Sequence, residues 1–388
     1  MAVLPSIDNA FIAIKDGHIA AFGPMNEAPN HADKIIDADG GYVLPTWCDP
    51  HTHLIFAAYR EGEFEDRIKG LSYEEIAQRG GGILNSAQKL QNATEDELYT
   101  QAFERLNKLI QLGTGAIEIK SGYGLTKDSE LKMLRVAKRL QKESNIPVKS
   151  NFLGAHAIPA DYKGDSDAYV EHIVNDMLPC VHKEGLADFI DVFCEKGYFN
   201  LEQAERILKA GQALDIQAKI HVNQFNILGG VELGVKYNAL SVDHLEVMNE
   251  TDISALKNSS TIPTALPSCS FFLSLDYTPA RRIIDNGLSM ALASDFNPGS
   301  TPSGNMNFVV SLACIKMKMT PEEAINAATL NAAYAMGVED QVGSITVGKL
   351  ANLIITKPIS SLAYIPYAFG ENHIAQVLVN GQEQISLN

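Results

Sequence analysis

Two histidines, His51 and His53, stand one residue apart at the end of the apolar run PTWCDPHTHLIF, where they could share a ligand. In an extended strand alternate side chains face the same side, so the two imidazoles would point the same way. Two imidazoles on one face can bind a cation together. A lone pair of this kind is as typical of polar surface, so its meaning depends on the rest of the chain.

Polar residues also follow other apolar runs of the chain. The runs are residues 41–53, 113–123, 146–156, 186–197, 215–224, 239–246, 260–268 and 288–295. They end near His51 and His53, Tyr123, His156, Cys194 and Glu195, His221, His244, Ser268, and Asp295. Five of the ten histidines lie at these ends, which random placement would rarely produce. The runs therefore predict strands that bring histidines together.

Segments with helical periodicity separate these runs. Residues 94–113 begin with Thr94 and Glu97 in a capping-box pattern and end at Gly113, and a similar segment begins at Thr126. Strand alternating with helix eight times predicts an α/β protein with a (β/α)8 TIM-like barrel. In such barrels the reactive groups lie at the C-terminal ends of the strands.

Four of the residues at the strand ends form a set that suits a metal ion. His51, His53, His221 and Asp295 supply three imidazoles and one carboxylate, which fits one Zn²⁺ or iron ion per chain with an open position for water. The ion would lower the pKa of that water toward neutrality. Taken alone, His221 and His244 could be hydrogen-bonded core histidines and Asp295 could cap a turn. A two-metal site using Lys196 is a further alternative.

The two ends of the chain have a different character from the middle. AFIAIKDGHIAAFGP predicts a hairpin that turns at Asp16-Gly17, and short strands with Gly turns recur near the C-terminus. We expect residues 1–44 and 341–388 to form one small β-sandwich domain beside a barrel of residues 45–340. The chain begins so close to the hairpin that an opening strand or two is expected to be missing.

The composition disfavours several classes of partner. The 388 residues carry 47 Asp plus Glu against 31 Lys plus Arg, a formal net charge of −16, which repels nucleic acid and anionic membranes. The five scattered cysteines indicate neither disulfides nor a thiolate zinc site, and neither a signal peptide nor a long apolar segment is evident. We expect a cytoplasmic protein.

The strand-end residues and several longer motifs resemble one known family. His-x-His on the first run, His on the fifth and sixth, and Asp on the eighth are similar to the amidohydrolase superfamily in its single-metal form. HTHLIFAAYREGEFEDRIKGLSYEEIAQRGGGI, IEIKSGYGL, FLGAHAIP, DVFCEKGYF and SDFNPGS resemble its imidazolonepropionases. The resemblance implies hydrolysis of a cyclic amide C–N bond in histidine catabolism, converting 4-imidazolone-5-propanoate to N-formimino-L-glutamate. It also allows for a homodimer.

The resemblance also implies roles for individual residues. The metal ligands are His51, His53, His221 and Asp295, and the substrate contacts are Arg60, Tyr73, Tyr123, His156, Gln224, Asn297, Gly299 and Ser300. For proton transfer we expect His244 to stabilise the oxyanion and Asp295 to move the proton. Gln224 cannot ionise, so it can only orient the ring. Related deaminating enzymes have a glutamate at that position.

Arg60 is expected to bind the propionate of the small anionic substrate, because a guanidinium offers a carboxylate two parallel donors. Without the resemblance, a surface ion pair with Glu61, Glu63 or Glu65 would be the simpler expectation, and the tyrosines would be packing residues. Two other functions remain open: a nucleobase or related deaminase, and a non-catalytic barrel that binds partners. Gln224 counts against the first, and the complete ligand set counts against the second.

Overall fold

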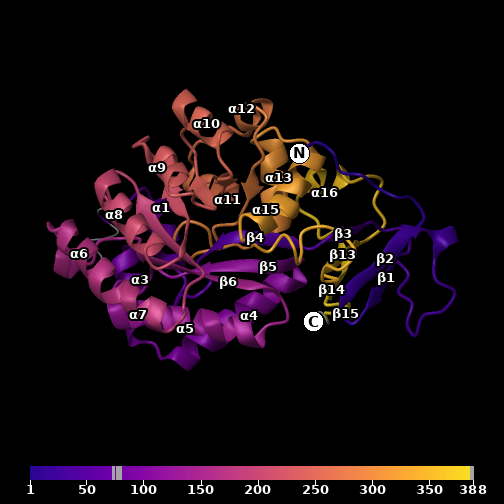
Figure 1. Ribbon diagram of the computed structural model, residues 1–388, viewed down its shortest axis with the longest axis horizontal. Coiled ribbons are helices and arrows are strands. Elements are labelled where there is room, and N and C mark those ends of the chain that lie inside the picture. Colours follow the sequence, from indigo (N-terminus) through magenta and orange to yellow (C-terminus); the bar gives the residue numbers. More distant parts are fainter. Residues whose placement is uncertain (72–74, 76–80, 385–388) are drawn as a thin grey trace.

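The computed structural model describes residues 1–71, 75 and 81–384, and a parallel barrel is its main body (Figure 1). The strands lie side by side in the order β4, β5, β6, β7, β9, β10, β11, β12. Their bounds are β4 Trp47–Thr52, β5 Thr114–Lys120, β6 Val148–Ala155, β7 Phe189–Cys194, β9 Ile220–Val222, β10 Ser241–His244, β11 Ile262–Ala265 and β12 Ala291–Leu292. A parallel bridge between Thr52 and Phe296 connects the first strand to the segment after the last. The predicted barrel fold is confirmed.

Helices cover the outside of the barrel (Figure 1). The helices of the described chain are α1 Glu61–Ile68, α3 Gly82–Asn92, α4 Glu95–Gln111, α5 Lys127–Glu143, α6 Ser166–His172, α7 Leu178–Lys183, α8 Leu201–Gln212, α9 Gly230–Lys236, α10 Glu250–Lys257, α11 Pro267–Leu273, α12 Ala280–Asp285, α13 Met306–Ile315, α14 Pro321–Ala328, α15 Leu330–Tyr334 and α16 Tyr364–Tyr367. A 3-10 turn at Ala160–Tyr162 and a π-helical turn at Ile173–Met177 accompany them, and a further 3-10 turn at Met25–Glu27 follows the N-terminal hairpin. Thr94 caps α4 in a full capping box with Glu97, and Thr126 caps α5, as predicted.

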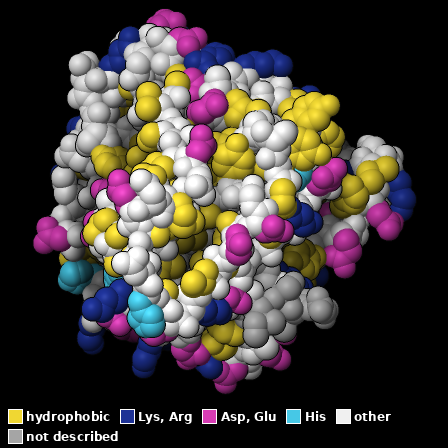
Figure 2. Space-filling model, turned by 90° about the vertical axis from the view of Figure 1, so that its right-hand side faces the viewer, with side chains coloured by type: hydrophobic (Ala, Val, Ile, Leu, Met, Phe, Trp, Pro, Cys, Tyr) yellow, Lys and Arg dark blue, Asp and Glu magenta, His cyan; other side chains and the backbone are white. Residues whose placement is uncertain are grey.

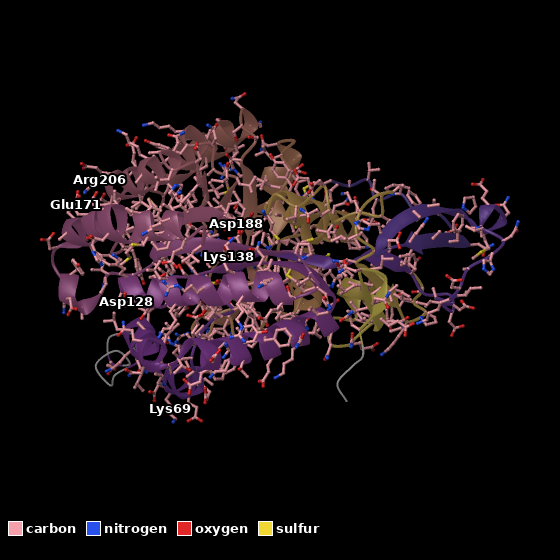
Figure 3. The ribbon with its side chains drawn as sticks, turned by 60° about the horizontal axis from the view of Figure 1, so that its bottom comes forward. Lys69, Asp128, Lys138, Glu171, Asp188 and Arg206 are labelled. Carbon is pink, nitrogen blue, oxygen red and sulfur yellow. The ribbon has the colours of Figure 1, made fainter. Side chains whose placement is uncertain are left out.

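Apolar side chains fill the layer between strands and helices, and ion pairs connect neighbouring helical segments at the surface. Phe152 and Ile190 of the strands pack with Leu134 of α5 in one buried cluster. Figure 3 labels two of the ion-paired sets: Lys138 of α5 lies 3.2 Å from Asp188, and Arg206 of α8 pairs with Glu171 of α6. Exposed or partly exposed pairs of this kind add little stability, so the apolar layer holds the helices in place.

Both ends of the chain build a small β domain beside the barrel (Figure 1). The antiparallel hairpin of β1 (Ala10–Lys15) and β2 (His18–Pro24) turns at Asp16-Gly17, both with positive φ, as a two-residue hairpin turn requires. A four-stranded sheet runs β15 (Gln382–Glu383), β14 (Ile374–Val379), β13 (Leu353–Thr356), β3 (Val43–Pro45). Ile19 of the hairpin packs against Leu353 of the sheet. On the face that presents this end of the molecule, apolar side chains alternate with charged ones of both signs (Figure 2).

Among the predicted strands, the fifth and the eighth differ from the structure in ways that bear on the site. The fifth is divided into β8 (Gln217–Ala218) and β9, and Lys219 between them is fully buried. The eighth ends at Leu292, so Asp295 follows the strand in a segment held by backbone bonds to β4. The side chains still reach the same end of the barrel. Among the described helices, none is long and apolar enough to cross a membrane. The exact domain boundaries stay predictions.

Candidate active site

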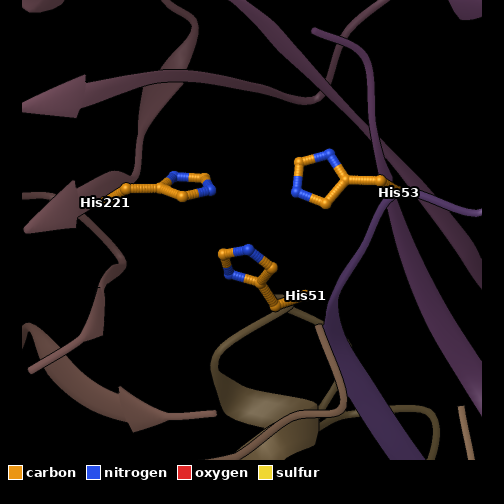
Figure 4. A group of neighbouring side chains, drawn as sticks. All are labelled: His51, His53 and His221. Carbon is orange, nitrogen blue, oxygen red and sulfur yellow. The ribbon is translucent and has the colours of Figure 1, made fainter. Parts of the chain in front are cut away.

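Three histidines from opposite sides of the barrel converge at the C-terminal ends of the strands (Figure 4). His51 in β4, His53 just after it and His221 in β9 present ligand nitrogens that all lie within 4.8 Å of one another. Asp295 joins them, because its Oδ1 lies 3.7 Å from Nε2 of His51 and of His53. The structure therefore brings all four predicted ligands together, and their alternation on the strand accounts for the first two.

Buried carboxylates hold two of these imidazoles in the orientation that a metal ligand needs. His51 donates from Nδ1 to Asp243 Oδ2 at 2.7 Å, and His221 donates from Nδ1 to Asp191 Oδ1 at 2.9 Å. Each ring then presents an unprotonated Nε2 to the centre. Within the described residues, Nε2 of both rings is buried and has no hydrogen-bond partner. Buried acceptors without partners are costly, so the residues fit a metal ion at this point.

Two of the imidazoles, those of His51 and His53, are also in the neutral charge state that binds metal. Burial, followed by the positive charge of Lys120, lowers the pKa of His51 well below its ordinary range. Burial and the adjacent His156 lower the pKa of His53 in the same direction. Neutral rings keep a lone pair for coordination.

A charged network inside the barrel supports the carboxylates. Lys120 Nζ lies 2.9 Å from Asp191 Oδ2, 3.5 Å from Asp243 Oδ2 and 2.6 Å from Glu118 Oε1. Although burial alone would raise the pKa of Asp191, its neighbours His221 and Lys120 hold it well below the usual value. Lys120 therefore places a positive charge beside both carboxylates that accept from the ligand histidines, and with His221 it keeps Asp191 ionised.

Sequence reasoning missed this network, although a signal was present. Glu118 and Lys120 interrupt the otherwise apolar run of β5, and Asp191 interrupts that of β7. Charged residues inside a strand buried on both faces need partners from other strands. Asp243 was overlooked because simple alternation places it and the adjacent His244 on opposite faces.

Backbone strain explains how His244 also reaches the site. Its φ is +87° and that of Leu245 is +66°, a left-handed conformation that costs free energy for residues with a side chain. The ring lies 5.4 Å from that of His221, centroid to centroid. Its Nδ1 is 3.3 Å from Glu246 Oε1. Burial opposes protonation, but the carboxylate of Glu246 raises the pKa of His244 above its ordinary value.

A pocket opens above the metal-ligand cluster. Its lining residues are His53, Tyr123, His156, Phe193, His221, Gln224, His244, Asp295, Asn297 and Ser300. His156 stacks on His53 with 5.0 Å between ring centroids and donates from Nδ1 to the Gly122 carbonyl at 3.0 Å. Burial, and then His221, lower the pKa of His156 to about 3, so its ring is neutral and can accept through Nε2. Phe193 is a lining residue that sequence reasoning did not identify.

Arg60 lies at the edge of the site against the turn that follows Asp295. A Cβ at Gly299 would lie 2.2 Å from Arg60 Nη1, so only glycine leaves room for the guanidinium there. The side chain is 11% exposed, and its Nε lies 3.4 Å from Glu63 Oε1. Among the described residues its Nη2 is buried without a hydrogen-bond partner. The surface ion pair expected as an alternative therefore accounts for only one side of the guanidinium.

The turn beside Arg60 is built by Asn297. Its Oδ1 accepts from the backbone N–H groups of Gly299 and Ser300, both at 2.8 Å. Its Nδ2 donates to Ser300 Oγ at 2.7 Å. This brings three of the predicted contact residues into one rigid turn next to Asp295.

Of the other predicted residues, Gln224 lies in the pocket and donates from Nε2 to Cys269 Sγ at 3.5 Å. Lys196 is exposed and lines a different pocket with Glu195 and Tyr198, away from the histidine cluster. Tyr73 lies outside the described residues. The geometry assembles the predicted site, while the role of each residue stays a prediction.

The sequence also matches known proteins. Residues 42–383 match the family model described as "Amidohydrolase family". Proteins named imidazolonepropionase from Christiangramia forsetii and Flavobacterium johnsoniae are 61% and 62% identical over 98% of this chain and 93% of theirs. The chain belongs to the amidohydrolase family, among its imidazolonepropionases. One from Shewanella oneidensis is 45% identical over 97% of this chain and 93% of its own. The predicted family and hydrolase class are confirmed, and the deaminase alternative is disfavoured.

Solved structures share the fold at low sequence identity. A 5-methylcytosine deaminase from Klebsiella pneumoniae superposes with a TM-score of 0.77 at 14% identity, covering 97% of this chain and 94% of that one. An adenosine deaminase from Xanthomonas campestris, solved with bound zinc, gives 0.71 at 16% identity over 97% and 88%. These likenesses support the barrel architecture. Membership of the amidohydrolase family and the buried histidine cluster support a metal cofactor.

Proposed function

We propose that this chain hydrolyses 4-imidazolone-5-propanoate to N-formimino-L-glutamate, using one Zn²⁺ or iron ion per chain. The observation that carries the substrate assignment is Arg60, a nearly buried guanidinium whose Nη2 has no partner among the described residues. A buried, unsatisfied guanidinium is costly unless an anion completes it. The propionate of the substrate would complete it, and the overall negative charge of the chain makes such a local anchor necessary.

His51, His53, His221 and Asp295 would hold the ion, since the three imidazoles lie together and Asp295 Oδ1 is 3.7 Å from Nε2 of the first two. Among the described residues, Nε2 of His51 and of His221 is also buried without a hydrogen-bond partner. When bound, the ion would act as a Lewis acid that makes water nucleophilic near neutral pH. Asp191 and Asp243 would keep the imidazoles in the ligand tautomer.

Proton transfer is the part of the reaction that the side chains must perform. Water adds to the ring carbonyl carbon, and the C–N bond then breaks only if the departing nitrogen receives a proton. Asp295 would accept the proton released by water and deliver it to that nitrogen. His244, oriented by Glu246, would stabilise the oxygen on which negative charge develops. Gln224 would hydrogen-bond the ring and fix its orientation.

The remaining pocket residues would position the substrate. Tyr123 lies beside Asn297, with its hydroxyl 3.4 Å from Oδ1, so the two groups share one wall of the pocket. His156, neutral and donating through Nδ1, offers Nε2 to a ring N–H. Ser300 and the backbone at Gly299 would complete the contacts next to Arg60, and Tyr73 is the remaining contact that the resemblance implies.

The purified, metal-loaded protein tests this proposal directly. With imidazolonepropionate as substrate, we expect the ring's ultraviolet absorbance to disappear while N-formimino-L-glutamate accumulates in equal amount. Guanine and 5-methylcytosine should release no ammonia. Ammonia from a nucleobase, with imidazolonepropionate left intact, would reject the proposal in favour of a deaminase.

A further inference from the structure

A second group of potential metal ligands lies beside the histidine cluster. His244 at the end of β10, Glu246 two residues later and Cys269 in α11 present ligand atoms that all lie within 4.8 Å of one another. All three side chains are buried. An imidazole, a carboxylate and a thiol are the three ligand types that zinc sites combine.

The spacing of these atoms is close to that of a real site. A tetrahedral zinc ion with bonds of about 2.0 to 2.3 Å separates its ligand atoms by roughly 3.3 to 3.8 Å. His244 Nδ1 and Glu246 Oε1 are already 3.3 Å apart. Small rotations of the Cys269 and Glu246 side chains would bring the thiol within range.

The carboxylate of Glu246 provides independent support for a cation at this point. Its side chain is 1% exposed, and within the described residues its Oε2 has no hydrogen-bond partner. The other oxygen has a weak bond from the Ser270 hydroxyl at 3.4 Å besides its contact with His244. A buried carboxylate oxygen without a donor is costly, and a cation would satisfy it.

Charge balance also favours a divalent cation at this point. On binding, the thiol proton would leave to solvent. The thiolate and the Glu246 carboxylate would then neutralise both positive charges, which a buried site requires.

An ion can reach these residues from the active-site pocket. His244 and Gln224 line that pocket, and Gln224 Nε2 is 3.5 Å from Cys269 Sγ. The route therefore passes over His53, His221 and Asp295, proposed ligands of the first ion, and the first site would fill first because it offers four donors instead of three.

We propose that His244, Glu246 and Cys269 form a second, weaker site for a thiophilic divalent cation such as Zn²⁺, and that its occupation inhibits the enzyme. The inhibition rests on the proposed function, in which His244 stabilises the developing negative charge. An ion bound to His244 would take that imidazole away from the reaction. Excess zinc would thus reduce turnover without displacing the first ion.

Cobalt provides a test that needs no substrate. Sulfur ligation gives Co²⁺ a charge-transfer absorption that the first site, with only nitrogen and oxygen ligands, cannot produce. The test uses protein holding one equivalent of zinc with the half-buried Cys180 and Cys314 replaced by serine. We expect the absorption to grow until one Co²⁺ per chain has bound. Adding Cys269→Ser should abolish it and leave the single zinc ion in place.

Zinc inhibition of the same two proteins connects the site to activity. Each is compared with its own rate before zinc is added. We expect the protein with Cys269 to lose activity as zinc exceeds one equivalent, and Cys269→Ser to need on the order of tenfold or more zinc for the same loss. No sulfur absorption in the protein that retains Cys269 would overturn the site itself, whatever the substrate. Equal zinc sensitivity of the two proteins would overturn the inhibitory role.

Discussion

His51 and Asp243, which are 192 residues apart in the chain, meet inside the barrel with 2.7 Å between Nδ1 and Oδ2. This contact fixes which nitrogen of His51 faces the proposed metal. The same carboxylate lies 3.5 Å from Lys120 Nζ, so its charge is balanced from within the barrel. A side chain that does not touch the metal therefore decides whether a ligand is ready to bind it.

Asp243→Asn should weaken metal binding while the fold remains. The amide keeps the shape of the carboxylate but loses the charge that orients His51 and offsets Lys120, so we expect metal affinity to fall about 10- to 100-fold. Competition with a chelator measures this. Asp188→Asn is the matched control. Asp188 is also a partly buried carboxylate and accepts hydrogen bonds from Ser150, but it lies outside the metal-ligand cluster. Equal metal retention by the two variants would contradict the positioning role.

Lys120→Met should destabilise the protein strongly. It leaves Glu118, Asp191 and Asp243 buried with one cation fewer, a change that typically costs about 3 to 5 kcal/mol. Urea unfolding at equal metal content measures the loss. Lys138→Met removes a partly exposed partner of Asp188 and should cost no more than about 1 kcal/mol. If both variants lose the same free energy of unfolding, Lys120 stabilises the protein no more than a partly exposed lysine does.

Arg60→Ala should mainly impair substrate capture. A charge-assisted pair in a nearly buried place is worth about 2 to 4 kcal/mol, so kcat/KM should fall on the order of 10² or more. Arg60→Lys should recover little, because a single ammonium cannot reproduce the paired donors. Lys69→Ala serves as control, because it removes an exposed cation directly after α1, the helix that begins directly after Arg60. Unchanged kinetics in Arg60→Ala would mean that another group binds the carboxylate.

His244→Asn and Gln224→Ala should separate two roles. We expect His244→Asn to keep its metal and lose kcat by about 10² to 10⁴, the range for an acid–base or oxyanion group. Gln224→Ala should raise KM and preserve more of kcat, since an amide can only orient the ring. Steady-state kinetics combined with metal analysis distinguishes the cases. The opposite pattern in metal-loaded proteins would show that the two roles are reversed.

Dialysed protein should retain one ion per chain, and removing it should lower thermal stability. An ion present at 100 times its Kd adds about 2.7 kcal/mol to the free energy of unfolding. His221→Ala should lose the ion, whereas His172→Ala, a half-buried histidine on α6, should retain it. Elemental analysis and melting curves provide the measurements. Two ions that survive dialysis would instead indicate a two-metal enzyme.

The sequence by itself determined the parts of this protein that depend on local chemistry. Capping at Thr94 and Thr126, the turn at Asp16-Gly17 and the alternation that aligns His51 with His53 all follow from neighbouring residues. Strand alternating with helix fixed the barrel, and the barrel in turn required the ends of its strands to meet. The predicted metal ligands could be listed for that reason.

Only the tertiary structure decided which distant side chains pair. Lys120 reaches Asp191 and Asp243 because three strands enclose one interior, and no local pattern specifies those partners. The left-handed backbone at His244, the shortened β12 and the close approach of Arg60 to Gly299 are likewise features of the folded chain that no local pattern specifies. Local periodicity gives a side chain its face on a strand. The packing of the whole chain determines what that face meets.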